Sequence, residues 1–483
     1  MKKMTRGQVH RAWSLAAVVV AVWLGGCMSE RAVYEEIYQN RQHAYEQWKK
    51  AREGHEGAQT VLKGELNISS AVLIAMGNNK ELQAITTDKD AASGRLMEAY
   101  SGLLPKLDAR GSYTRVDAVS APGGVAVGAL NNYQAELVLT QPIFHGGAIW
   151  AGIRGAKVFS YLTDQKVATT VQEVVNQVRR GYYDVLLGQE LVSVSQGDAD
   201  VAKAHLSDVE KKKAAGVSSQ YDMLRARVDV SNVEAQLIER QSAVHVAMTT
   251  LLKTLGVSQE SLVELTDRLE YQKVTPDIEE AVKTAYRERP EILQAELIIR
   301  LDREALKEAW AGFLPRLDAS YARTLAKPDP HDATRDEWGR SWNAGLTLDW
   351  PVFDGLATMG RVRQAKAGLQ KAVIELAGAE EQVLLEVKQA MFDLEDADKL
   401  VASQADNLER AREALRLVKA GYDAGVNTEL EMLDARQALS QSQALYYQAV
   451  YKYEVAKLGL QRAQGLLKSQ DMFGVQGAGG GRK

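Results

Sequence analysis

Cys27 is the only cysteine among the 483 residues, and it is the most reactive side chain that the sequence places in a recognisable context. The small residues Gly25 and Gly26 precede it, which suits a peptidase that cuts directly before a cysteine. A single cysteine excludes a disulfide framework and any Cys-rich metal site. No Gly-rich phosphate loop, nucleophile elbow or HExxH motif is present. We therefore predict that the protein is not an enzyme and holds no cofactor.

The histidines and the overall charge exclude two further classes of function. Seven histidines are too scattered to predict a metal site, and we expect each to be a surface or packing residue, including His55, His145, His205, His245 and His331. The formal net charge is −4, so no global basic field would recruit nucleic acid.

The residues before Cys27 are typical of an export signal. Residues 2–11 carry several lysines and arginines, and residues 12–23 are an apolar run too short to span a bilayer. The end of this run resembles a bacterial lipobox, with Cys27 as the lipidated first residue of the mature protein. The alternative is an ordinary signal peptide followed by an incidental cysteine. Met28 stands where Asp usually retains such lipoproteins in the inner membrane, so the resemblance implies the outer membrane of a Gram-negative bacterium, with a lipid anchor.

The pair of carboxylates Glu431 and Asp434 is a second chemical feature, since a spacing of three places both on one face of a helix. Gly425 lies just upstream and can take a positive φ to end a helix. Thr428 and Glu431 fit the hydroxyl-x-x-acid pattern that begins the next helix. The same signals occur earlier in the chain, at Gly216, Ser219 and Asp222. Each group predicts the tight tip of a helical hairpin.

The two hairpins belong to an internal repeat. Gly102–Ala109 recurs as Gly312–Ala319 at an offset of 210, and Ala215–Val217 recurs as Ala424–Val426 at an offset of 209. We interpret the chain as two copies of one unit. The predicted domains are a lipoprotein signal peptide (1–26), a charged, helical, lipidated periplasmic segment (27–64), a first repeat (65–258), a linker (259–274), a second repeat (275–468) and a flexible tail (469–483).

Each copy is expected to run helix, strand, strand, long helix, turn, long helix. The long helices carry apolar residues at alternating steps of three and four, for example Val387, Ala390, Leu394, Ala397 and Val401. A period of 3.5 sustained this far predicts coiled-coil packing along a long axis. The helix expected from Ala156 to Lys213 would be roughly 87 Å long, which is more than a globular domain needs.

The strands alternate strictly between apolar and polar residues, as in Tyr133–Thr140 and Trp342–Trp350. Such a pattern fits a strand between lipid and water, and it fits one face of a soluble sandwich as well. Only four strands are predicted, and the exported chain has no helix-length apolar run. An open four-stranded sheet in lipid would expose unpaired edges. A membrane sheet of this size must therefore close with strands from other subunits.

A strand pair followed by a long helical hairpin, repeated twice behind a lipobox, resembles the TolC family of outer-membrane efflux and secretion channels. The most specific similarity lies in Ala420–Thr428 and Leu433–Ala435. The resemblance implies a mainly α fold, in which long antiparallel helical hairpins form an α-barrel and each chain of a homotrimer contributes four strands to a shared transmembrane β-barrel. It implies a periplasmic adaptor, an inner-membrane pump and outer-membrane lipid as partners.

The resemblance also implies roles for individual residues. In the family, two acidic positions after the second tip form rings at the periplasmic mouth, and Glu431 and Asp434 occupy them here. Tyr422 matches a tyrosine that bonds to an aspartate of the neighbouring hairpin, and Asp222 matches that aspartate. The alternatives are that Glu431 only caps its helix and that Tyr422 only packs in the seam. Asn427 replaces an arginine clasp, so a weaker closed state is expected.

The two tips match the segments that contact the adaptor in the family. They are Gly216, Val217 and Ser218 in the first copy, and Gly425, Val426 and Asn427 in the second. The function expected from these features is the outer-membrane channel of a tripartite efflux system. Two alternatives stay open: the outer-membrane channel of a type I protein secretion system, and a non-porous coiled-coil structural lipoprotein.

Overall fold

The computed structural model describes residues 30–52, 61–117, 129–332 and 334–468. They divide into two compact units, one containing the residues up to Leu66 together with Val257–Leu265, the other containing Asn67–Gly256 and the chain from Thr266 onward. The predicted signal peptide, Cys27 and the predicted tail lie outside the described residues.

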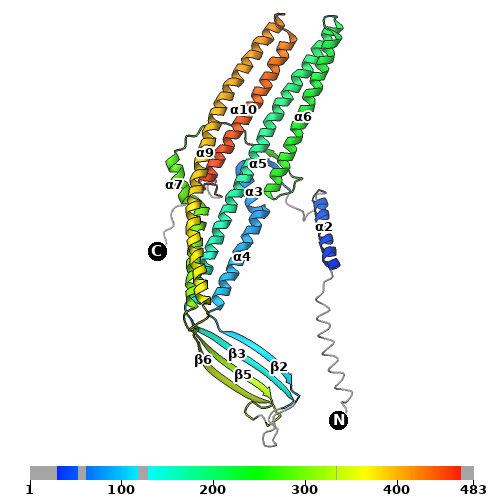
Figure 1. Ribbon diagram of the computed structural model, residues 1–483. Helices are drawn as coiled ribbons and strands as arrows, with labels where there is room; N and C mark the ends of the chain where they lie inside the picture. Colours follow the sequence, from blue (N-terminus) through cyan, green and yellow to red (C-terminus); the bar gives the residue numbers. More distant parts are fainter. Residues whose placement is uncertain (1–29, 53–60, 118–128, 333, 469–483) are drawn as a thin grey trace, which may run out of the picture. The chain divides into compact units, whose positions relative to one another are not determined.

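The first unit contains a helix and a small sheet (Figure 1). Helix α2 spans Glu30–Arg52, which agrees with the helical segment expected before residue 64. Strand β1 (Lys63–Leu66) pairs in parallel with β4 (Leu262–Leu265), and Lys63 lies opposite Leu262. The expectation of only four strands is wrong, since the described chain has six. Strands of four residues offer too little alternation to be recognised in sequence.

The second unit is built mainly from helices, which occur in the same order before and after Thr266 (Figure 1). Two shorter helices, two strands and two long helices follow one another in each half. The helices are α3 (Ile68–Asn78), α4 (Lys80–Ser101), α5 (Ala148–Ala214) and α6 (Gln220–Leu255), then α7 (Ile278–Glu288), α8 (Pro290–Ala311), α9 (Ala357–Asp423) and α10 (Glu429–Ala463). The prediction of a mainly α protein with long helical hairpins is confirmed.

The long helices pack through small and β-branched residues. Helices α5 and α9 each have 67 residues, which makes each about 100 Å long. Helix α5 pairs with α6 and helix α9 with α10, and α5 also packs against α10. The predicted apolar seam of α9 is buried from Val387 through Val401 as far as Leu408. Farther toward the tip, Leu415 and Val418 of the same seam are only half-buried.

Four strands form one antiparallel sheet in the order β2-β3-β5-β6 (Figure 1). They are β2 (Lys106–Arg115), β3 (Asn131–His145), β5 (Arg316–Lys327) and β6 (Gly339–Asp349). The alternation predicted from sequence places the large apolar side chains on one face, where they are exposed: Leu107 is 68% exposed, Leu346 72% and Trp342 70%. We call this the apolar face and the opposite one the polar face.

None of the helices that the structure describes combines the length and the hydropathy that crossing a bilayer would require.

Candidate functional site

The tips of the two long hairpins have the same backbone design. Gly216 ends the turn after α5 with φ 74°, and Gly425 ends the turn after α9 with φ 75°. Both take the left-handed conformation that favours glycine. A Cβ atom on either glycine would meet open space. The tips therefore need glycine for backbone conformation and not for close packing.

Each tip also begins its second helix with a capping box, as predicted. The Ser219 hydroxyl accepts from the Asp222 N–H at 3.1 Å, and the Asp222 carboxylate accepts from the Ser219 N–H at 2.9 Å. Thr428 and Glu431 make the same reciprocal pair at 3.3 and 2.8 Å. The Ser219 hydroxyl, which donates to Asp222, lowers the pKa of that carboxyl. The Thr428 N–H does the same for the pKa of Glu431.

The lowered pKa values make the order of both tips dependent on pH. A carboxyl whose folded-state pKa is depressed stabilises the fold above its unfolded pKa and loses that contribution as the pH falls through the folded value. The ordinary values are 3.8 for Asp222 and 4.5 for Glu431. We expect a spin label at position 426 to gain mobility as the pH falls from about 6 to about 3.5.

The control for this prediction is Glu431→Gln. Glutamine keeps the capping geometry but does not titrate, so its tip should show a much smaller pH response. An equal response in the variant and the natural protein would contradict the assignment.

In the structure, the Glu431 side chain caps the start of its own helix, α10. Its Oε2 accepts from the Thr428 N–H, from the Thr428 hydroxyl at 3.1 Å and from Asn427 Nδ2 at 3.2 Å. The capping role that the sequence left open is thus present. Asp434 lies one turn farther along α10 and is exposed. Both carboxylates are at the start of one helix, next to the tip, as the spacing predicted.

Tyr422 and Asp222 are not brought together within the chain. The Tyr422 hydroxyl accepts from Lys212 Nζ at 3.1 Å, and the ammonium also lies 5.0 Å from the ring centroid. This hydrogen bond raises the pKa of Lys212. The Asp222 carboxylate instead accepts hydrogen bonds from the hydroxyls of Ser218 and Ser219. Lys212 is therefore the cross-hairpin partner of Tyr422, a role that sequence reasoning missed.

His205 forms a second bond between the hairpins. It is 9% exposed near the C-terminal end of α5, and its Nε2 lies 2.9 Å from Glu429 Oε1 in the first turn of α10. The expectation of a surface or packing histidine is incomplete, because this side chain also links the two hairpins. The two residues are 224 positions apart, so no local pattern could have paired them.

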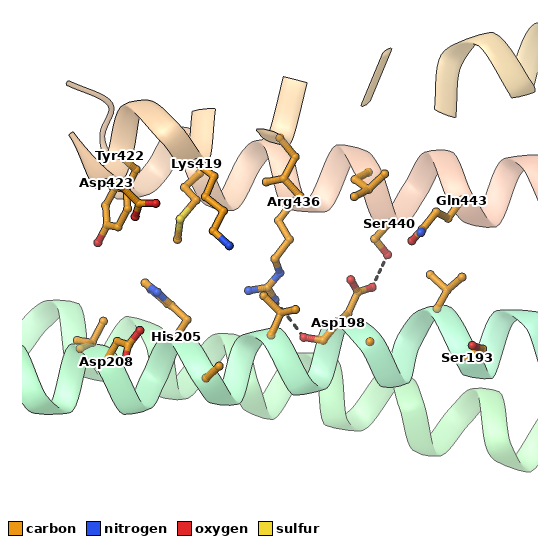
Figure 2. A pocket seen from close by; sticks show the side chains of 18 of the residues that line it. Ser193, Asp198, His205, Asp208, Lys419, Tyr422, Asp423, Arg436, Ser440 and Gln443 are labelled. Carbon is orange, nitrogen blue, oxygen red and sulfur yellow. Dashed lines mark hydrogen bonds between the residues drawn. The ribbon is translucent and has the colours of Figure 1, made fainter. Parts of the chain in front are cut away.

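Arg436 forms a third link, farther from the tip (Figure 2). Its Nη2 donates to Asp229 Oδ2 of α6 at 3.3 Å and to the Asp198 carbonyl of α5 at 3.4 Å. Ser440 donates its hydroxyl to the Asp198 carboxylate. The Arg436 side chain is 12% exposed, and its Nη1 is buried without a hydrogen-bond partner among the described residues. Burial raises the pKa of Asp198.

These links border a cavity of about 540 Å³ between the hairpins. Figure 2 shows His205 and Asp198 of α5 facing Lys419 of α9 and Arg436 of α10 across it. Valine, leucine and methionine side chains complete the walls. Acidic and basic groups are mixed, so the cavity has no single charge. Its geometry suits two hairpins that separate along this surface more than it suits a catalytic pocket.

In the part of the chain that the structure describes, no group of three or more His, Cys, Asp or Glu side chains could hold a metal ion.

Comparison with known proteins agrees with this architecture. Escherichia coli K12 outer membrane protein TolC is 24% identical over 411 residues, which cover 83% of this chain and 82% of TolC. The alkaline protease secretion protein AprF of Pseudomonas aeruginosa is 23% identical and covers 83% of this chain and 84% of its own length. The crystal structure of CusC superimposes with a TM-score of 0.71 at 18% identity, covering 82% of this chain and 92% of CusC.

A family model supplies the decisive comparison. The model of the outer membrane efflux protein family matches residues 73–257 and again residues 281–466, so the two matches together cover most of the chain. The chain therefore belongs to the outer membrane efflux protein family.

Proposed function

We propose that this chain is the outer-membrane channel of a tripartite efflux system, giving an exit duct from a periplasmic adaptor and an inner-membrane pump to the outside. The prediction that it is not an enzyme is confirmed by its family. The observation that carries the channel proposal is the exposed apolar face of a sheet of four strands, joined to long paired helices. A coiled-coil spacer without a pore needs no such sheet.

The proposed assembly is a homotrimer. Four strands cannot close a barrel, and small single-chain membrane barrels have about eight strands or more. Three copies would supply twelve, so that β2 and β6, the edge strands of each sheet, pair with the neighbouring copies. The paired helices would continue from the barrel into the periplasm as an α-barrel. In this proposal the two halves of the chain are the repeats 65–258 and 275–468.

Cys27 would add a lipid anchor to this assembly, and the segment 27–64 would then start at the membrane. The tips at Gly216–Ser218 and Gly425–Asn427 would contact the adaptor. Their support is the matched geometry of the two turns, since Val217 and Val426 are 77% and 81% exposed. Exposed valines on ordered turns are available for a protein partner.

The carboxylates near the second tip would form the periplasmic aperture. Glu431 and Asp434, repeated three times, would place six carboxylates about one axis, a field that favours cations. The test is the double variant Glu431→Gln/Asp434→Asn in planar lipid bilayers. We expect the cation-to-anion permeability ratio to fall several-fold and block by multivalent cations to weaken.

Glutamine preserves the cap at position 431, so the change removes charge and not the turn. Glu210→Gln is the control, because it removes an exposed carboxylate of the first hairpin, which pairs with Arg227. Unchanged selectivity in the double variant would remove both residues from the aperture. A purified protein that conducts no ions and stays monomeric would contradict the channel itself.

One observation favours the alternative function, the outer-membrane channel of a type I protein secretion system. It is the similarity of the chain to AprF. The geometry of the chain does not separate a drug or metal cargo from a protein cargo, because the pump selects the substrate in both systems. Family membership favours efflux.

A further inference from the structure

The apolar face of the four-stranded sheet carries Arg323 and Arg340, besides Arg115 and Lys327 at the ends of β2 and β5. Arg323 of β5 lies directly opposite Trp342, and Arg340 of β6 lies directly opposite Leu325. The two arginines are therefore diagonal neighbours across one strand pair, with backbones about 7–8 Å apart. Both side chains are exposed. A charged side chain on a face of leucine, tyrosine and tryptophan requires a physical reason.

No carboxylate of the sheet can neutralise these arginines. The acidic residues of β2, β3, β5 and β6 all share the parity of the polar face: Asp108, Glu136, Asp318 and Asp349. Arg110 illustrates the contrast, since it lies on the polar face directly opposite Glu136. Among the described residues, neither Arg323 nor Arg340 has an ion pair or a hydrogen-bonded side-chain partner.

None of the described loop acids near the end of the sheet forms an ion pair with either arginine, including the exposed Asp117 and Glu337. Asp336 pairs with Lys327 at 3.7 Å, and Asp332 pairs with Arg335 at 3.2 Å. Asp329 accepts from the His331 N–H at 2.8 Å. The segment 118–128 between β2 and β3 contains no charged residue.

A second copy of the chain would not supply the missing charge either. Identical strands place their carboxylates on the same polar face, whichever edges meet. On β2, the strand that would meet β6 of a neighbour, the apolar face carries Leu107, Ala109, Gly111, Tyr113 and Arg115, none of which is acidic. The anion that faces these arginines must therefore come from outside the protein.

The arginines also lie toward one end of the sheet. The helices join the strands at one end of the sheet (Figure 1). At the other end, which we call the loop end, β2 ends opposite the start of β3 and β5 ends opposite the start of β6. Arg340 is the second residue of β6 after its loop, and Arg323 is four residues from the loop end of β5, about 13 Å. With the helices in the periplasm, this end lies in the outer leaflet, where an arginine can extend to the head groups at little cost.

We propose that Arg323 and Arg340 form a binding site for the phosphate groups of a phosphorylated lipid in the outer leaflet; this inference rests on the proposed membrane function. Arginine offers a planar fork of donors that fits phosphate oxygens in pairs. Both arginines line one shallow hollow together with Gly111 and Ala135, and Arg110 and Glu136, which lie opposite each other on β2 and β3, also border it. The small residues Gly111 and Ala135, in register with Arg340, leave room for a head group.

The test is native mass spectrometry of the full-length protein in detergent with added diphosphoryl lipid A. We expect Arg323→Gln/Arg340→Gln to weaken lipid binding on the order of thirtyfold, and Arg323→Lys/Arg340→Lys to fall between this variant and the natural protein. Arg316→Gln is the matched control on the polar face, where Arg316 lies opposite Asp349 and outside this hollow, and it should bind normally. Monophosphoryl lipid A should bind more weakly than the diphosphoryl form, and phosphatidylcholine should not compete.

Equal lipid binding by the glutamine double variant and the natural protein would overturn the proposal. So would an equal loss in Arg316→Gln, which would show nonspecific attraction, or displacement of the lipid by inorganic phosphate at equal concentration, which would show a site for the free anion. The same spectra give the oligomeric state. A trimer with unaffected lipid binding overturns this inference alone, whereas a monomer in every sample overturns the proposed function as well.

Discussion

Replacing Arg436 by methionine loosens the contact between the two hairpins and destabilises the protein by about 1–3 kcal/mol. Arg436 is the only cation in the described chain that bonds to both Asp229 and the Asp198 carbonyl. Its loss leaves the Asp198 carboxylate in a half-buried site without a nearby positive charge. We expect faster amide hydrogen exchange in α5 around Asp198 and in α10 around Ser440. If the hairpins close the channel, the mean conductance at neutral pH rises as well.

The dependence on pH separates this mechanism from a simple loss of packing. Burial holds the pKa of Asp198 above its ordinary value of 3.8, while Arg436 lowers it. An acid whose folded-state pKa is raised costs stability when it is ionised, and that cost disappears as the pH falls toward the unfolded value. The deficit of Arg436→Met should therefore be largest near neutral pH and shrink toward pH about 4.

Arg227→Met provides the matched control, because Arg227 precedes Arg436 by 209 positions in the repeat. It is 57% exposed and bonds only within its own hairpin, to Glu210 at 3.0 Å. An exposed pair of this kind contributes well under about 1 kcal/mol. Asp198→Asn should restore part of the stability lost in Arg436→Met. Equal destabilisation by Arg227→Met and Arg436→Met would contradict the link between the hairpins.

These two arginines also show what the sequence can and cannot reveal. Both stand in the same local context, after a glycine turn and a capping box, and the repeat predicts both positions. Burial distinguishes them, and burial depends on which face of the hairpin meets α5 or α10. The same holds for the bond between His205 and Glu429, because the two residues are 224 positions apart and meet only where their helices pack together.

Features with a short-range cause were predictable. The seam of α9, the positive φ of Gly216 and Gly425, and both capping boxes follow from residues within a few positions of one another. The alternating strands were predictable because their period of two is strict. The pairing of β1 with β4 was not predictable, because each strand has only four residues and its partner strand lies about 200 positions away in the sequence.

Gly256→Ala should be far more damaging than the same change at either tip. Gly256 ends α6 with φ 74°, nearly the same conformation as Gly216. A Cβ atom there would lie 2.2 Å from the carbonyl oxygen of Asn78, whereas at Gly216 it would meet nothing. The Asn78–Asn79 backbone is held in place, because Asn79 caps α4 and its Nδ2 donates to the Thr254 carbonyl at 2.7 Å. The α3–α4 junction would have to move away from α6.

The second half of the chain contains a similar close approach of a glycine to the backbone of a neighbouring segment. The four glycine variants can therefore be ranked by their expected loss of stability. Gly465 has φ 73°, and its Cβ atom would lie 2.9 Å from the backbone of Glu288. Backbone strain alone costs about 1–2 kcal/mol in Gly216→Ala and Gly425→Ala. Steric overlap adds about 1–3 kcal/mol at the crowded positions.

Thermal unfolding and protease resistance of the full-length variants should therefore rank Gly256→Ala as least stable, then Gly465→Ala, then the two tip variants. If all four variants lose the same stability, backbone strain alone accounts for the loss. The close contact between Gly256 and the α3–α4 junction then makes no contribution to stability.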